Sequence, residues 1–475
     1  MPILRTLVGC RNDWRLRRPR VPNPPRPGIG WVGPFLMLGA TAAGWLAFAD
    51  AKGDDGSVAF ALFIGSVSIL LMSWSNTLAT RSGLLEPLFG GLDKMHRWHR
   101  WFGAMAVGAM WLHIQTVDDV KGIRGASKSV AEAAEELAGT GEVLLYVLIV
   151  ASLVRWIPYR WWRQSHKLLI LPYVFASWHF HTATKPYANS SLWGRWFQAI
   201  MLLGIATWAY RVLWRDGIRR GVAYRISGID RTSSVTTLEM EPAKRKMKFR
   251  PGQFVFLRIG SRSVSEPHPF TIASGPSEPV LRIHVKNLGD WSGTLADRVS
   301  VGDTVRVEGP YGRLHLFPKR SHPVVWIAGG VGITPFLGTI SEGGGTGHVP
   351  HLFYAVRSRN EAPGLDVLAS AHAEGRIVLH LHVSDEGSRL RPDDLRDVFG
   401  PNGLRGAHVA MCGPDALIND MTRTVRSLGA RHVHVEAFDI RTGIGPDLSR
   451  EVDQLIGSIR SRMFDRESAV QDSPR

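Results

Sequence analysis

The stretch His-Arg-Trp-Phe-Gly-Ala-Met-Ala-Val-Gly-Ala-Met-Trp-Leu-His, residues 99–113, decides the fold class of the first half of the chain. It has a histidine at each end, and Arg100 is its only other charged or ionisable residue. In a helix, His99 and His113 would lie about 21 Å apart along the axis and about 40° apart around it. Ionisable groups inside an apolar helix are costly and indicate a functional site. The stretch predicts a membrane span with one ligand-type side chain near each face.

Five further apolar runs surround this stretch, and each approaches the ~20 residues that a membrane helix needs. The six predicted spans cover residues 29–49, 56–80, 101–117, 143–154, 168–184 and 196–210, within a membrane domain at 29–213. Lys and Arg number 19 on one side of these spans, including the basic tail 1–28, and 6 on the other. This distribution predicts a multi-pass protein of the cell (plasma) membrane, embedded in lipid, with both termini cytoplasmic. The net charge of +16 thus reflects topology, and we expect no nucleic-acid partner.

A second pair of histidines brackets the fifth span in the opposite chain direction. His166 and His179 are 13 residues apart, or about 20 Å along a helix. We therefore expect His99 to pair with His166 on the cytoplasmic side, and His113 with His179 on the outer side. The chain has two cysteines in all, far apart in sequence, so metal sites must rest on other ligands. Two histidines from parallel helices suit haem iron, whereas zinc would want more ligands per site.

The angles between histidines around the helix of the fifth span leave one alternative for the outer ligand. On an ideal helix His179 is about 140° from His166, whereas His181 is only about 60° away. Pro172 lies between them and permits a kink that can rephase the helix. We therefore predict His179 as the ligand and keep His181 as the alternative.

The second half of the chain reads as two soluble domains. Residues 221–320 hold short alternating runs separated by Gly, Pro and Asp turns, which predicts an antiparallel Greek-key β-barrel. Residues 321–441 begin with a buried strand at 324–328 that runs into a Gly-rich turn, and further strands at 352–357, 377–383 and 407–412 predict a parallel α/β nucleotide-binding domain. Residues 442–475 form a C-terminal extension.

Five motifs in this half occur in a characteristic order. They are His268-Pro269-Phe270-Thr271-Ile272-Ala273-Ser274, Gly289-Asp290-Trp291-Ser292, Glu308-Gly309-Pro310-Tyr311-Gly312, Gly329-Gly330-Val331-Gly332-Ile333-Thr334-Pro335 and Cys412-Gly413-Pro414. Together with the histidine-bearing spans they resemble the ferric reductase and NADPH oxidase family, in which a six-span haem b domain is fused to a ferredoxin-NADP reductase-like module. The resemblance covers about residues 29–441.

The resemblance implies roles for individual residues. Thr271, Cys412 and Phe438 would be catalytic: Thr271 near the reactive flavin ring, Cys412 near the nicotinamide, and Phe438 covering the flavin. The other residues expected to bind FAD are His268, Pro269, Phe270, His284, Lys286, Trp291 and Ser292. Those expected to bind NAD(P)H are Gly329, Gly330, Gly332, Thr334, Pro335, Arg357, Arg359, Gly413 and Pro414.

The implied activity is electron transfer across the membrane. Cytoplasmic NAD(P)H would reduce FAD, and electrons would cross two b haems to an outer acceptor. We expect ferric iron chelates as that acceptor; the alternatives are O2 reduced to superoxide or peroxide, and an extracytoplasmic redox protein. Arg357 and Arg359 follow the second strand of the nucleotide domain and would suit the 2′-phosphate of NADPH, whereas Glu361 close by would suit NADH.

Overall fold

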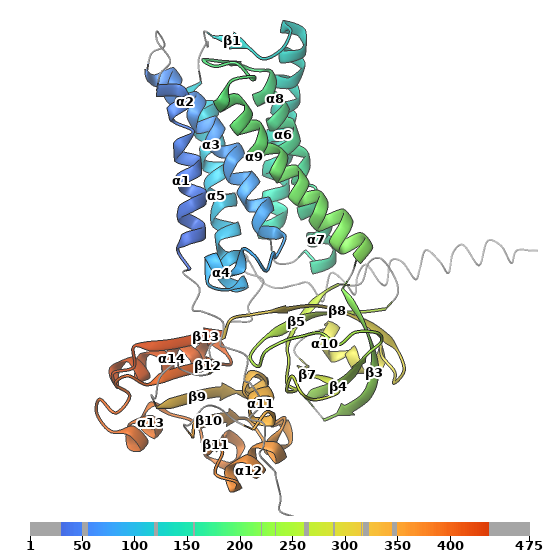
Figure 1. Ribbon diagram of the computed structural model, residues 1–475, viewed down its shortest axis with the longest axis vertical. Helices are drawn as coiled ribbons and strands as arrows, with labels where there is room; N and C mark the ends of the chain where they lie inside the picture. The colour runs from blue at the N-terminus through green and yellow to red at the C-terminus, as the bar shows by residue number, and fades with distance from the viewer. Residues whose placement is uncertain are drawn as a thin grey trace, which may run out of the picture.

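The computed structural model describes residues 30–49, 56–117, 122–154, 157–219, 221–232, 234–260, 266–287, 290–314, 316, 323–343 and 349–436. The predicted tail 1–28, the extension 442–475 and Phe438 lie outside these residues. A helical bundle stands at one end of the molecule, and two sheet domains lie together at the other (Figure 1).

Apolar helices with few charges build the bundle. In chain order these are α1 (Val32–Ala43), α2 (Leu46–Ala49), α3 (Gly56–Ala79), α4 (Glu86–Phe89), α5 (Leu92–Thr116), α6 (Lys128–Leu153), α7 (Tyr159–Lys167), α8 (Ile170–Thr182), α9 (Leu192–Ala209) and the π-helix η1 (Tyr210–Arg219). Within the described part of the chain, three helical stretches are long and apolar enough to cross a membrane: 57–79, 128–153 and 192–218. Exposed Val and Leu side chains on α6 fit a lipid-facing surface.

Two helices differ from the sequence expectation. The helix that contains the fourth predicted span, α6, begins at Lys128 rather than near 143, so Glu132, Glu135 and Glu136 lie on it. The physical reason is that 131–138 is rich in Ala, Glu and Leu, which are strong helix formers.

The fifth predicted span, 168–184, corresponds to α8, but His166 at its start lies on a separate helix, α7, and the turn Leu168–Leu169 divides the two. Pro172 has no N–H to donate to the carbonyl of Leu168, which instead accepts from Leu171 at 2.9 Å, three residues ahead. His166 and His179 therefore belong to different helices, and the ideal-helix angle between them does not apply.

An antiparallel sheet follows the bundle and curls toward closure. Its strands are β3 (Val222–Arg231), β4 (Val235–Pro242), β5 (Phe254–Ile259), β6 (His268–Thr271), β7 (Leu281–Lys286) and β8 (Thr304–Tyr311), in the order β6-β5-β8-β3-β4-β7. A bridge between Ile272 and Ile283 joins the two edges of the sheet. Alternate residues such as those of β7 face a buried apolar core, which the short helix α10 (Asp290–Gly293) helps to cover through Trp291.

The third unit is a parallel sheet between helices. Its strands are β9 (Val324–Gly329), β10 (His351–Val356), β11 (Val378–Val383), β12 (His408–Cys412) and β13 (His432–Glu436), in the order β11-β10-β9-β12-β13. Helices α11 (Thr334–Ser341), α12 (Leu365–Ala373), α13 (Pro392–Phe399) and α14 (Asp415–Ser427) alternate with them. From β9 the strands are added in one direction along the sheet, through β10 to β11, and then on the other side of β9, through β12 to β13. Ligands of such sheets bind in the crevice at this switch in strand order, between β9 and β12.

Candidate functional site

The inner histidine pair lies where α5 meets α7. The ring centroids of His99 and His166 are 6.0 Å apart, with the rings edge to face. Nδ1 of His99 is 2.9 Å from the carbonyl oxygen of Ser75, and Nδ1 of His166 is 3.1 Å from Oγ of Ser152. Each ring is thus oriented through one nitrogen, which leaves Nε2 for a ligand.

The outer pair lies toward the other end of α5. Nδ1 of His113 is 2.8 Å from the carbonyl oxygen of Ala61, and Gly65, one turn further along α3, leaves room for this ring. Among the described residues, the buried Nδ1 of His179 has no hydrogen-bond partner. His181 is exposed, with Nδ1 3.4 Å from Nε2 of Gln198. The interior of the bundle therefore holds His179 rather than His181.

The donor set fits haem better than a bare metal ion. Two imidazoles per site suffice for an iron whose other ligands come from the haem ring itself. Among the residues that the structure describes, no group of three or more His, Cys, Asp or Glu side chains is placed to hold a metal ion. A zinc site built from protein side chains normally needs such a group.

The flavin motif occupies β6, beside α10. The ring of His268 stacks on Trp291 with centroids 3.8 Å apart, and Phe270 stacks on the same indole at 5.8 Å. Pro269 lies between them, and Ser292 follows Trp291 on α10. Within the described residues, the buried Oγ1 of Thr271 has no hydrogen-bond partner. A buried hydroxyl costs free energy when unpaired, so this position fits a bound group that would complete it.

Two residues of β7 face different partners. Nδ1 of His284 is 2.8 Å from Oγ1 of Thr237 on β4, and burial lowers the pKa of His284 to about 4. His284 is therefore neutral at pH 7 and cannot balance a phosphate charge. The ammonium of Lys286 reaches the Gly-rich turn, where Nζ is 3.9 Å from the position of a Cβ on Gly330. The other cation of this strand, Arg282, is paired with Glu239 and Glu278, so Lys286 is the one placed to meet a phosphate at the turn.

The glycines of the turn after β9 have separate roles. A Cβ on Gly332 would lie 2.2 Å from the carbonyl oxygen of Cys412, and one on Gly329 would lie 2.8 Å from Cδ of Pro414. These two glycines let the ends of β9 and β12 pack together. Gly330 has a φ of +54° and open space around it, so its backbone is free to approach a ligand.

The neighbours of these glycines hold the two strand ends in place. A Cβ on Gly413 would lie 3.0 Å from the amide nitrogen of Gly329. Oγ1 of Thr334 donates to the carbonyl of Val331 at 2.9 Å, and Pro335 is the second residue of helix α11. Thr334 and Pro335 thus shape the turn and the first turn of the helix that follows.

Cys412 ends β12 and lies in register with Glu436 at the end of β13. Burial raises the pKa of the Cys412 thiol well above its usual range, so the thiol is neutral. Burial, with the charges of Asp93 and Glu86 adding, raises the pKa of Glu436 to about 8. Sequence reasoning missed Glu436, although it stands two residues before Phe438 in the same segment.

The two arginines proposed for nucleotide choice are exposed beyond β10. Arg359 makes two hydrogen bonds to Glu386, at 2.8 and 3.0 Å, and Nε of Arg357 is 3.7 Å from Oδ1 of Asp385. Both carboxylates follow β11, the neighbouring strand. The acidic partners of the arginines thus come from an adjacent strand.

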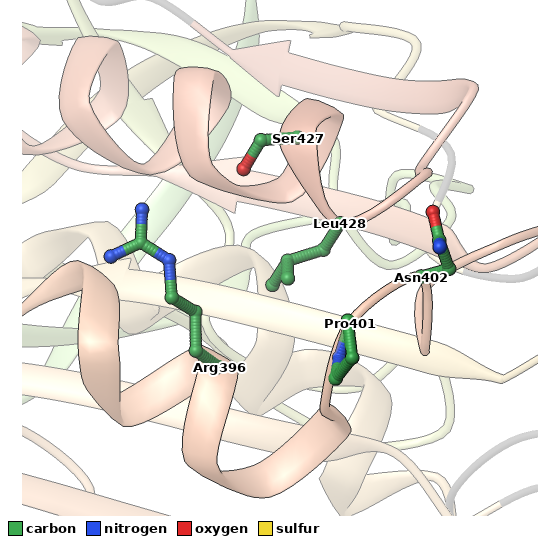
Figure 2. A pocket seen from close by; sticks show the side chains of 5 residues that line it. All are labelled: Arg396, Pro401, Asn402, Ser427 and Leu428. Atoms are coloured by element: carbon green, nitrogen blue, oxygen red, sulfur yellow. The ribbon is translucent and has the colours of Figure 1, made fainter.

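A hollow of about 300 Å³ lies beside α13 and α14, and its lining includes no residue of the five motifs (Figure 2). It is lined by Arg396, Pro401, Asn402, Ser427 and Leu428. The guanidinium of Arg396 is already paired with Asp393 at 2.6 Å. We place no cofactor there.

Comparison with known proteins finds matches in both halves. Residues 64–177 match the family described as ferric reductase like transmembrane component, and residues 225–315 match an FAD-binding domain. The chain is 30% identical to a flavohemoprotein of Chromobacterium violaceum, over 41% of this chain and 54% of that protein. It is 36% identical to NADPH oxidase 3 of Rattus norvegicus, over 22% of this chain and 20% of that protein.

A third relative is a superoxide-generating NADPH oxidase heavy chain of Dictyostelium discoideum, 25% identical over 47% of this chain and 43% of that protein. The chain spans about half or less of the length of these three relatives. A transmembrane component joined to an FAD-binding domain defines the class, a membrane flavoprotein oxidoreductase. Within that class, these matches confirm the resemblance to the ferric reductase and NADPH oxidase family that was found in the motifs.

Proposed function

We propose that this chain passes electrons from cytoplasmic NAD(P)H through FAD and two b haems to an acceptor on the far side of the cell (plasma) membrane, with ferric iron chelates as that acceptor. Each NAD(P)H that becomes NAD(P)+ releases two electrons and one proton, which suffices to reduce two Fe(III) to two Fe(II). The observation that carries the proposal is the pair of histidine sites, one toward each end of α5.

When bound, FAD would accept a hydride and yield single electrons, which haem iron takes one at a time. The chain's own task is alignment. His99 and His166 would hold the inner haem, and His113 and His179 the outer one, with each ring except that of His179 oriented by a hydrogen bond within the protein.

The reductase half would hold the two nucleotides at the end of the parallel sheet. The open backbone at Gly330 and the ammonium of Lys286 would meet phosphates, while Thr271 and His268 would face the flavin. Burial keeps Cys412 neutral, so a thiol rather than a thiolate would border the nicotinamide. We further propose NADPH as the donor, because Arg357 and Arg359 follow β10 where a 2′-phosphate would lie.

The topology we propose has six spans: α1 with α2, α3, α5, α6, α7 with α8, and α9. Both termini would be cytoplasmic, as the excess of Lys and Arg indicates. The inner site then lies on the side of the two sheet domains, since α4 and α7 face them in Figure 1.

A second acceptor, O2, is favoured by the relatives, one of which is named as superoxide-generating. Two O2 molecules would then take one electron each. An extracytoplasmic redox protein is the third acceptor to test.

The test uses the full chain in vesicles supplied with NADPH on the cytoplasmic side. Fe(III) chelate, O2 and a quinone are offered in turn outside, with haem and FAD content measured beforehand. We expect two haems per FAD and the fastest turnover with Fe(III). His113→Ala and His179→Ala should each remove only the outer haem, while the matched control His181→Ala keeps both. Loss of haem in the control alone would reverse the ligand assignment.

A further inference from the structure

A buried cluster of charges joins the bundle to the barrel. Its centre is Asp216 of η1, whose carboxylate accepts from three guanidiniums: Arg163 of α7 at 2.7 Å, Arg211 of η1 at 2.7 Å and Arg258 of β5 at 2.5 Å. The side chains of Arg258 and Asp216 are only 3% and 10% exposed. This is therefore no solvated surface pair, and removing one partner of such a cluster leaves buried charge uncompensated.

A second carboxylate extends the cluster along the barrel. Oε2 of Glu308 on β8 is 3.7 Å from Arg258, and Oε1 is 3.2 Å from Nε of Arg215. Arg215 also donates to the carbonyl of Thr80, just beyond α3, at 2.6 Å. Arg258 thus lies between two acidic groups, of which Asp216 is the one that belongs to the bundle.

Asp216 connects the neighbourhoods of the two cofactor sites. Arg163 precedes His166 by one turn of α7. Arg258 follows Leu257, whose register partner on β6 is His268 of the flavin motif. One carboxylate therefore links the helix of an inner-site histidine to the strand beside the flavin motif.

We propose that Asp216 is a positioning residue, which holds the flavin motif in register with α7 and so sets the rate at which the reductase half reduces the inner site. The proposal rests on the proposed function. Without the carboxylate, Arg163 and Arg211 would lose the anion that they share with Arg258, and Arg258 would keep only Glu308, at 3.7 Å, as an acidic partner. A displacement of about 1 Å between reacting groups can cost about 100-fold in rate.

Apolar contacts should preserve the fold when this charge is removed. Phe256 and Tyr311 of the barrel are buried in one cluster with Phe89 and Met95 of the bundle. The guanidinium of Arg81 also lies over the ring of Phe256, 3.8 Å from its centroid. The two halves should therefore stay associated in a neutral variant, with their register loosened.

The experiment compares full-length Asp216→Asn with the wild type. The matched control is Asp297→Asn, which neutralises an exposed carboxylate that pairs with Arg231 at 3.3 Å on the barrel surface. Three quantities are measured: NADPH-driven reduction of a soluble dye, the rate of haem reduction after mixing with NADPH, and hydrogen exchange of peptides from α7 and β5 without nucleotide.

For Asp216→Asn we expect dye reduction within about twofold of the wild type, haem reduction slower by about tenfold or more, and faster exchange in α7 and β5. The control should match the wild type in all three. Haem reduction within about twofold of the wild type, or an equal fall in dye and haem reduction, would overturn the proposal.

If Asp216→Asn does not accumulate, Arg163→Gln is used, because it removes only the contact from α7. This variant must also reduce the dye at nearly the wild-type rate and the haem more slowly. Wild-type protein lacking FAD or haem would instead defeat the proposed function. The exchange measurement on Asp216→Asn needs no electron transfer, so it tests the positioning role separately.

Discussion

Gly65 of α3 leaves the space that the ring of His113 occupies. A Cβ at this position would lie 2.8 Å from Nδ1 and 2.9 Å from Cε1 of the ring, whereas ordinary contact begins at 3.4 Å. In Gly65→Ala the ring must therefore retreat by about 0.6 Å, the difference between 3.4 and 2.8 Å. A retreat directly away from Ala61 would lengthen the 2.8 Å hydrogen bond to about 3.4 Å, beyond the usual limit of about 3.2 Å.

Overpacking of this kind costs about 1 to 3 kcal/mol, which corresponds to about 5- to 140-fold weaker retention of the outer haem. The assay is the ratio of haem to FAD in the purified protein, together with the reduced-haem spectrum. We expect the ratio to fall from two toward one, with the inner haem unchanged.

Gly108→Ala on α5 is the matched control, because a Cβ there meets nothing within 4 Å. It adds the same methyl group to a membrane helix of the same bundle and should keep both haems. Two haems with an unaltered spectrum in Gly65→Ala would refute the reasoning, since the ring would then not be fixed where the ligand role requires it.

Three further predictions concern the reductase half. The pKa of Glu436 is raised from 4.5 to about 8 in the folded protein, so between these values the folded protein keeps a proton that the unfolded chain loses. Stability should therefore fall as pH rises from about 4.5 to about 8, and Glu436→Gln should flatten the dependence of Tm on pH. Parallel curves of Tm against pH for the variant and the wild type would contradict this prediction. Arg359→Ala should cost about 1 to 3 kcal/mol in kcat/KM with NADPH and little with NADH. Glu386→Gln removes the carboxylate that pairs with Arg359 and should raise the preference for NADPH. Equal losses for both nucleotides in Arg359→Ala would exclude a phosphate contact. Gly332→Ala should destabilise the reductase half by about 3 kcal/mol or more, because its Cβ would meet the backbone of Cys412 at 2.2 Å, and an unchanged Tm would show that the turn can relax.

Local pattern predicted much of the fold. The buried strand predicted at 324–328 coincides with all but the last residue of β9, because buried strands are marked by their own apolar residues. The prediction of where α6 begins was wrong, because hydrophobicity marks where a helix enters lipid and not where the helix itself begins. The break before α8 was foreseen only as a kink at Pro172, because a missing hydrogen bond does not specify where the chain turns.

Site residues could be predicted where the residue type alone indicates the role. Histidines at the ends of spans are visible in a sequence, and so are glycines in a turn. Glu436 was missed because its environment comes from Cys412 on the neighbouring strand and from Asp93, hundreds of residues earlier. The cluster at Asp216 likewise unites residues from four elements, α7, η1, β5 and β8, and no spacing along the chain predicts it.

The apolar contact of β5 and β8 with the bundle matters to anyone who would produce the reductase half alone. Phe256 and Tyr311 are buried in one cluster with Phe89, Met95 and their neighbours from the bundle. A fragment beginning at residue 221 would carry these rings on an open face, together with Arg258, which would have lost its partner Asp216. Exposed apolar patches of this kind promote aggregation. Such a fragment needs polar replacements on that face, as does any attempt to graft this reductase onto a different electron acceptor.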